Sequence, residues 1–165
     1  MLGTRTHAGF SLIELLIVVT IIGIIATIAI PNLLASRRAA NEASAQSSLR
    51  TISSCEASYQ ATDGAGTYGD LTGLSSHVLT DAVLASGNKS GYQFVATPLA
   101  VKPAQFWAYA FPQVSSGIAQ TGTRRYAIAE DGVLRGDRTL TVPASHAAVI
   151  GSGSPLTGGM PPLGN

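Results

Sequence analysis

The feature that most constrains this chain is an apolar run near its N-terminus. Residues 15–30 contain no charged side chain, and residues 10–30 contain only one, that of Glu14. A helix of this length spans roughly 30 Å, which is the thickness of the hydrocarbon core of a bilayer. The run therefore predicts a membrane-spanning helix, with the more polar remainder of the chain forming a separate domain.

Two simpler interpretations of this run explain it less well. A secretory signal peptide usually has an apolar region of about 7–15 residues, and no clean Ala-x-Ala cleavage site follows this longer run. A plain membrane anchor explains the length but not Glu14. A carboxylate in a spanning helix costs roughly 2.5–3.5 kcal/mol at the bilayer centre and less near the interface. Such a residue is functional by default, so Glu14 requires a partner.

The charges on the two sides of the run bear on orientation and on binding. Arg5 precedes the run, whereas Arg37, Arg38 and Arg50 follow it. By the positive-inside rule this distribution would place the large C-terminal part in the cytoplasm. The net charge is +1, and loss of the first nine residues brings it to zero. A neutral chain gives no electrostatic reason to expect sequence-specific nucleic-acid binding, and it favours self-association.

A short motif at the start of the run points to a known family. The residues Gly9-Phe10-Ser11-Leu12-Ile13-Glu14 resemble the processing motif of type IV prepilins and pseudopilins, and Pro31-Asn32-Leu33 continues the likeness. The resemblance implies cleavage between Gly9 and Phe10 by a prepilin peptidase, followed by N-methylation of Phe10. It also implies that Glu14 pairs with the N-terminal amine of a neighbouring subunit. Finally, it implies that the globular part lies outside the inner membrane, against the simple charge count.

The chain stays favourable to a helix after Pro31, until about Ala61. One face of this stretch is apolar at spacings of three and four residues, which is typical of a helix packed on a core: Ala45, Leu49, Ile52, Cys55 and Tyr59. Cys55 is expected to be a buried apolar residue, and a single cysteine excludes an internal disulfide. Gly23 and Pro31 should weaken the helix between them, because proline removes a hydrogen bond and glycine has low helix propensity.

The C-terminal part predicts a short helix and several adjacent strands. Residues 62–74 are expected to form a loop, and Ser75–Ser86 a short helix with Ser76 as its N-cap. Strand-like runs occupy 91–97, 105–111 and 125–130, and Asp131-Gly132 predicts a hairpin into 133–135. Residues 143–165 are rich in Gly, Pro and Ser and are expected to be either loosely ordered or draped on the surface.

The predicted fold class is α+β. A long N-terminal helix, membrane-spanning in its first half, packs with its C-terminal half on a small antiparallel β-sheet, which is the pilin fold that the resemblance implies. The expected parts are a leader peptide (1–9), a transmembrane and filament-core helix (10–30), its amphipathic continuation (31–61), a loop with a short helix (62–90), the sheet (91–142) and a tail (143–165).

We expect no enzyme, no cofactor and no metal site. The three histidines, His7, His77 and His146, lack metal-ligand spacing, and no nucleophile motif is present. Asp131 and Asp137 are weak candidates for calcium. Arg135-Gly136-Asp137 spells a cell-adhesion tripeptide that we attribute to chance.

The predicted function is that of a structural subunit, of the major type, in a bacterial type IV pilus used for adhesion, twitching motility or DNA uptake. The alternative is a pseudopilin of a type II secretion system. In either case the chain would first be a single-pass protein of the bacterial inner membrane, surrounded by lipid. It would then join a filament of identical subunits, extracellular in the case of a pilus. The resemblance implies three further partners: the prepilin peptidase, an inner-membrane assembly platform and a cytoplasmic ATPase.

Overall fold

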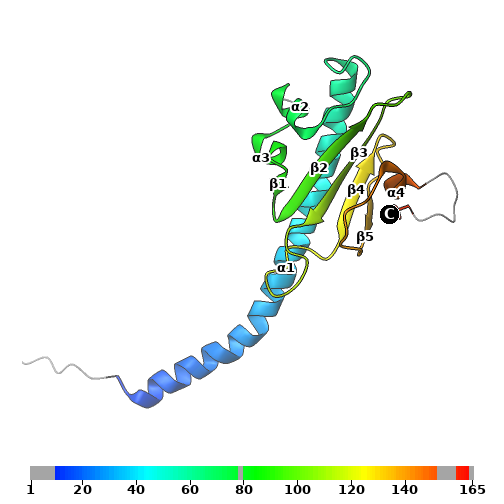
Figure 1. Ribbon diagram of the computed structural model, residues 1–165. Helices are drawn as coiled ribbons and strands as arrows, with labels where there is room; N and C mark the ends of the chain where they lie inside the picture. The colour runs from blue at the N-terminus through cyan, green and yellow to red at the C-terminus, as the bar shows by residue number, and fades with distance from the viewer. Residues whose placement is uncertain (1–9, 78–79, 152–158, 164–165) are drawn as a thin grey trace, which may run out of the picture. The chain divides into compact units, whose positions relative to one another are not determined.

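The computed structural model describes residues 10–77, 80–151 and 159–163. The chain divides into two compact units, Met1–Ser36 and Arg37–Asn165. Helix α1, Leu12–Ala61, contributes to both units (Figure 1). The predicted leader, residues 1–9, lies outside the described residues.

The first unit consists, in its described part, of the beginning of α1. The helix starts at Leu12 and continues without a break through Gly23 and Pro31. Nearly every side chain of this part is exposed. The first unit therefore buries no apolar core of its own.

The second unit is built on a five-stranded antiparallel sheet in the order β1-β2-β3-β4-β5 (Figure 1). Its strands are β1 (Asn88–Lys89), β2 (Tyr92–Leu99), β3 (Gln105–Pro112), β4 (Arg125–Ala129) and β5 (Arg135–Asp137). The four predicted strands and their antiparallel pairing are confirmed, and β1 was missed. The last strand begins at Arg135 rather than Val133, because the Val133 N–H donates to Asp131 at 3.0 Å and still belongs to the turn.

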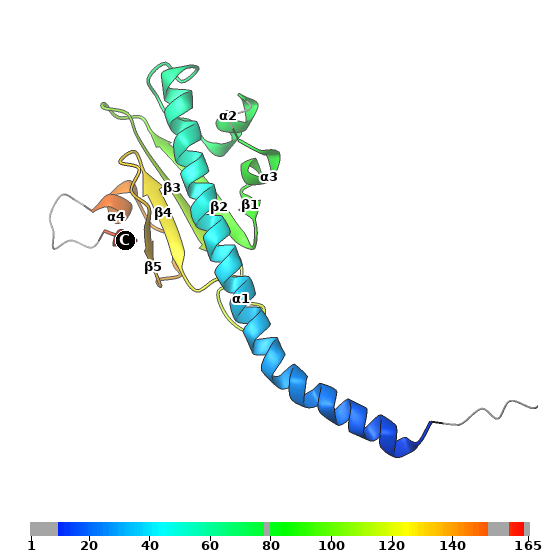
Figure 2. The ribbon, with the colours of Figure 1, turned by 180° about the vertical axis from the view of Figure 1, so that it is seen from behind.

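The two faces of the sheet carry different clusters of apolar side chains. Successive strand residues point to opposite faces. Phe106 and Ile128 lie in the cluster that contains the buried face of α1, whereas Trp107 and Ala129 lie in a second cluster. Figures 1 and 2 show α1 and helix α4 (His146–Ile150) on opposite sides of the sheet. The predicted stripe is confirmed, since Ala45, Leu49, Ile52 and Cys55 are buried and Tyr59 packs against them.

The predicted helix at Ser75–Ser86 is wrong in its bounds. The structure has two shorter helices, α2 (Leu71–Ser76) and α3 (Ala82–Ala85), so residues expected to form a loop begin a helix instead. Their N-caps are Asp70 and Asp81, whose carboxylates accept backbone N–H bonds at 2.7 Å. Ser76 ends α2 rather than starting a helix. Aspartate and serine are about equally favourable N-caps, so the residue type alone did not decide which of them begins a helix.

The tail is more structured than its composition predicts. Helix α4 places Val149 in the second cluster with no exposed surface, and Met160 joins it. The segment 161–163 runs beside β5, where the Leu163 N–H donates to the Leu134 carbonyl at 3.0 Å. Of the two expectations for the tail, loose order does not hold for 146–150 and 159–163, which instead pack on the sheet. Apolar residues scattered among glycines and prolines cover a sheet face that would otherwise be exposed.

Candidate functional site

Two of the predicted processing and assembly residues, Phe10 and Glu14, lie just before α1 and in its first turn. Gly9 lies outside the described residues. Phe10 directly follows it and has 76% of its surface exposed. Glu14 lies in the first turn of the helix and is also exposed. Both described residues are thus accessible from outside this chain.

Glu14 caps the beginning of its own helix. The Ser11 N–H donates to Oε2 of Glu14 at 2.9 Å, and the Glu14 N–H donates to the Ser11 carbonyl at 3.1 Å. A serine followed three residues later by a glutamate is the sequence signature of a capping box, so this contact could have been predicted. A carboxylate at this end also interacts favourably with the helix dipole. Since a carboxylate offers about four acceptor positions, this cap leaves capacity for a second partner.

The turns that follow Glu14 present apolar side chains on all sides. α1 is the one helix in the described part of the chain that is long and apolar enough to cross a membrane, judged by length and composition. The 18-residue window that meets this test has none of its residues buried. The exposed large side chains include Leu15, Leu16, Ile17, Val18, Val19, Ile21, Ile22, Ile24, Ile25, Ile28 and Ile30. A helix that is apolar all round needs either lipid or other protein around it.

The region of Gly23 and Pro31 contains two further features that affect the helix. Thr20 and Thr27 donate their hydroxyl hydrogens to the carbonyls four residues earlier, at 2.7 and 2.8 Å. Such bonds compete with the backbone ladder and often bend helices. The glycine and the proline were predicted to weaken the helix, whereas these threonines were not. The role of Gly23 and Pro31 in flexibility stays a prediction, because the stretch is helical here.

Polar residues of α1 hold the connection between β3 and β4. Arg38 donates from Nε to the Gln120 carbonyl at 3.3 Å, and Asn41 donates to the Thr121 carbonyl at 3.0 Å. Glu42 accepts hydrogen bonds from the N–H and the hydroxyl of Thr123, both at 2.7 Å. Arg38 and Glu42 thus both contact a segment about eighty residues away in the chain.

Glu56 is a buried carboxyl that sequence reasoning missed. It is fully buried, and its Oε2 accepts the Gly69 N–H at 2.9 Å. Among the described residues nothing donates to its Oε1. Burial raises the pKa of Glu56 to about 7, against the lowering effect of the Gly69 N–H. Burial likewise raises the pKa of the neighbouring Cys55 thiol, as expected for a packed rather than a reactive cysteine.

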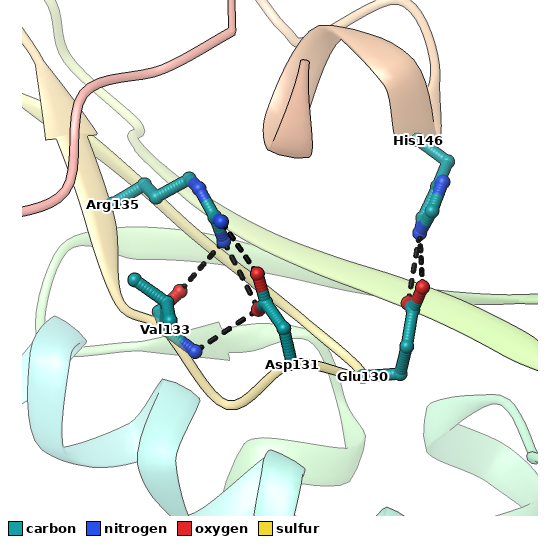
Figure 3. Close-up of polar contacts among 5 residues, drawn as sticks. All are labelled: Glu130, Asp131, Val133, Arg135 and His146. Carbon is teal, nitrogen blue, oxygen red and sulfur yellow. Dashed lines mark hydrogen bonds and ion pairs between the residues drawn. The ribbon is translucent and has the colours of Figure 1, made fainter. Parts of the chain in front are cut away.

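The hairpin between β4 and β5 brings together several charged residues (Figure 3). Arg135 forms an ion pair with Asp131, and His146 contacts both carboxylate oxygens of Glu130 at 2.8 and 3.0 Å. Burial raises the pKa of Asp131, but the Arg135 guanidinium and the Val133 N–H outweigh it and hold that pKa below its usual value. The contact of His146 ties the start of α4 to the end of β4.

The same hairpin bears on the calcium and adhesion candidates. Asp137 forms an ion pair with Arg125 at 2.7 Å, so both weak calcium candidates are engaged by arginines. The described residues contain no group of three or more His, Cys, Asp or Glu placed to hold a metal ion. In the adhesion tripeptide, a Cβ on Gly136 would come within 2.9 Å of Tyr126. Close packing in the sheet therefore accounts for this glycine.

Comparison with known proteins finds similarity in the N-terminal segment of the chain. Residues 4–30 match the family described as prokaryotic N-terminal methylation motif. The chain is also 60% identical over 38 residues to the type IV wide pilus major component PilA4 of Thermus thermophilus. That alignment covers 23% of this chain and 29% of the Thermus protein, so it spans less than a third of either. No solved structure matches the chain significantly.

Fold and site together define a class of protein. An α+β domain with a small antiparallel sheet is joined to a long apolar N-terminal helix that carries a carboxylate in its first turn. The methylation motif in residues 4–30 and the similarity to PilA4 over 38 residues make the N-terminal part of the chain similar to type IV pilins, and the α+β architecture is consistent with the pilin fold.

Proposed function

We propose that the chain is a structural subunit, of the major type, of a bacterial type IV pilus. The observation that carries this proposal is the fully exposed apolar segment of α1, which directly follows the residues of the processing motif. Exposing the apolar side chains of residues 15–30 to water would cost tens of kcal/mol, at roughly 1.5–3 kcal/mol each. The segment therefore passes from one apolar environment to another during assembly.

The first environment is the lipid of the inner membrane, which the helix would cross once. The second is a bundle of the same segment from neighbouring copies, because these copies offer the matching apolar surface. The filament is thus a homo-oligomer with a core of packed N-terminal helices. Extraction from lipid requires work, for which we propose a cytoplasmic ATPase acting through an inner-membrane assembly platform. The finished filament is extracellular.

Processing would prepare the chain for this exchange. Cleavage between Gly9 and Phe10 by a prepilin peptidase removes residues 1–9 and creates an amine at Phe10, which is then methylated. The new amine lies one residue before Ser11, whose N–H donates a hydrogen bond to the Glu14 carboxylate. We propose that the remaining acceptor capacity of the Glu14 carboxylate receives the Phe10 amine of a neighbouring subunit. In a medium of low dielectric constant each charge is costly alone, so this pairing would set the register between subunits.

The proposed division of the chain follows the same scheme. Residues 1–9 would be the leader, 10–30 the filament core and 31–61 the support of the globular domain. Residues 62–90, 91–142 and 143–165 would form the loop region, the sheet and the tail. Gly23 and Pro31 would let the helix adjust between lipid and filament, partly unwinding in the latter.

A pseudopilin of a type II secretion system is the alternative, since it would share the N-terminal half. The similarity to a pilus major component favours the pilus. The two functions separate in one experiment: electron microscopy and shear fractions of cells with and without the gene for this chain, together with an assay of secreted proteins. We expect surface filaments containing the chain, lost on deletion and restored by complementation. Loss of secretion with unchanged surface filaments would instead identify a pseudopilin.

A further inference from the structure

The connection between β3 and β4, residues 113–123, exposes apolar side chains at its tip. It contains no charged residue. Ile118 is 80% exposed and Val114 is 39% exposed, although both belong to a segment that is otherwise small and polar. Gly117, with φ of 80°, makes the turn that presents Ile118. An isoleucine this exposed on a short loop gains nothing from the fold of this chain and can gain from an external apolar partner.

Hydrogen bonds within the loop give it a defined conformation. The Thr121 N–H donates to the Val114 carbonyl at 3.0 Å, and the Val114 N–H donates back to the Thr121 hydroxyl at 3.2 Å. The Gln120 side chain donates to the Ser115 carbonyl at 3.0 Å. These bonds close the base of the loop and satisfy backbone groups internally. This lowers the cost of bringing the tip into a poorly hydrated environment.

The base of the loop is fastened to α1 at Arg38 and Glu42, which follow the apolar segment in the chain. Figures 1 and 2 both draw the connection beside α1, and the bonds from Arg38 and Glu42 to Gln120 and Thr123 fix it there. Arg38 is eight residues beyond Ile30, the last residue of the apolar segment. Eight residues of a continuous helix such as α1 rise about 12 Å, and even a fully extended chain of eight residues spans at most about 28 Å. A bilayer that holds the apolar segment therefore has its surface within reach of this loop.

Basic residues lie beside the loop as well. Arg37 is exposed, and Arg38 and Arg124 are half-buried. The acidic residue on this part of α1, Glu42, is already engaged by Thr123 and Tyr126. An apolar tip next to arginines is the pattern of a segment that dips into the headgroup and acyl boundary of anionic lipid.

We propose that residues 113–123 form a second lipid contact of the subunit before assembly, with Ile118 and Val114 in the boundary region and the arginines on anionic headgroups. This inference rests on the proposed membrane insertion of α1. This contact would hold the globular domain against the bilayer surface with residues 113–123 facing the lipid. Each subunit would then have to break this contact when it is extracted from the membrane into the filament.

The test uses the full chain reconstituted in vesicles of phosphatidylcholine and phosphatidylglycerol whose acyl chains carry bromine near the headgroup end. The chain has one tryptophan, Trp107, which provides the baseline. Ile118→Trp should add emission of which roughly half or more is quenched, because a side chain about 5–10 Å deep lies within reach of the bromines. The matched control is Val101→Trp, another exposed apolar position, in the β2–β3 turn at the other end of the sheet. Its added emission should be unquenched.

Two further variants separate the possible failures. Ile30→Trp reports insertion of the helix itself, because this exposed residue lies at the end of the apolar segment, at the depth of the bromines. Quenching at position 30 without quenching at 118 would overturn the loop contact alone, whereas quenching at neither would overturn the membrane insertion too. Arg37→Gln with Arg124→Gln should reduce the affinity of the loop for anionic vesicles, about fivefold per residue removed, and should have little effect in pure phosphatidylcholine. Position 118 unquenched in vesicles but shielded in sheared filaments would assign the loop to a neighbouring subunit and overturn the proposal.

Discussion

The buried carboxyl of Glu56 makes a quantitative prediction about stability and pH. In the folded chain its pKa is raised by burial from 4.5 to about 7. Because the folded pKa lies above the unfolded one, the folded state keeps its proton at pH values where the unfolded state has lost it. The stability from this group is therefore fully present below about pH 4.5 and is lost as the pH rises towards 7.

The magnitude follows from the size of the shift. At 1.36 kcal/mol per pKa unit, a rise from 4.5 to about 7 corresponds to about 3 kcal/mol of unfolding free energy. Glu56→Gln removes this dependence, because the amide stays neutral and its oxygen can still accept the Gly69 N–H. The variant should thus gain about 3 kcal/mol relative to the unmodified chain between pH 4.5 and pH 8.

The assay is urea unfolding of the full chain in detergent, followed by the fluorescence of Trp107, which is buried in the sheet. Every other titratable group is present in both chains and cancels in the difference. Asp131→Asn is the matched control: the Arg135 guanidinium holds the pKa of Asp131 below its usual value, so its difference should stay constant across this range. A difference for Glu56→Gln that stays constant within about 0.5 kcal/mol across this range would refute the reasoning.

Four further predictions follow from the apolar helix and the packing of the sheet. Mass spectrometry of purified filaments should find a chain that lacks its first nine residues and begins with a methylated Phe10; an N-terminus at or beyond Ala29 would indicate ordinary signal-peptide cleavage. Glu14→Ala should impair filament yield in shear fractions but spare membrane insertion, because it makes the segment more apolar; unchanged yield would contradict the pairing. Ile24→Asp should block piliation by burying an unpaired charge, and normal piliation would contradict the packed core. Gly122→Ala should lower the unfolding free energy by about 1–3 kcal/mol, because its Cβ would overlap the buried Tyr92 ring, with Cζ at 2.6 Å; an unchanged urea midpoint would contradict this.

The long apolar helix in the N-terminal third of the chain could be predicted from the sequence, because the signals that predict it are local. The length of the apolar run, the isolated Glu14 and the order of residues around Phe10 do not depend on distant parts of the chain. The stripe from Ala45 to Tyr59 was predictable for a related reason, since the helical period alone decides which side chains share a face. The strands followed in the same way from alternation and from the Asp131-Gly132 turn.

Tertiary structure decided the features that depend on pairs distant in sequence. Glu42 and Arg38 looked like surface charges until the segment 120–123 was placed against them. Glu56 has the same residue type as Glu14, yet it is buried because the chain after α1 folds back and lays Gly69 over it. The tail has the composition of a loose segment, but Val149 and Met160 cover the second face of the sheet. Local sequence sets which elements form, whereas burial and polar contacts depend on which elements meet, and that is a property of the whole packed chain.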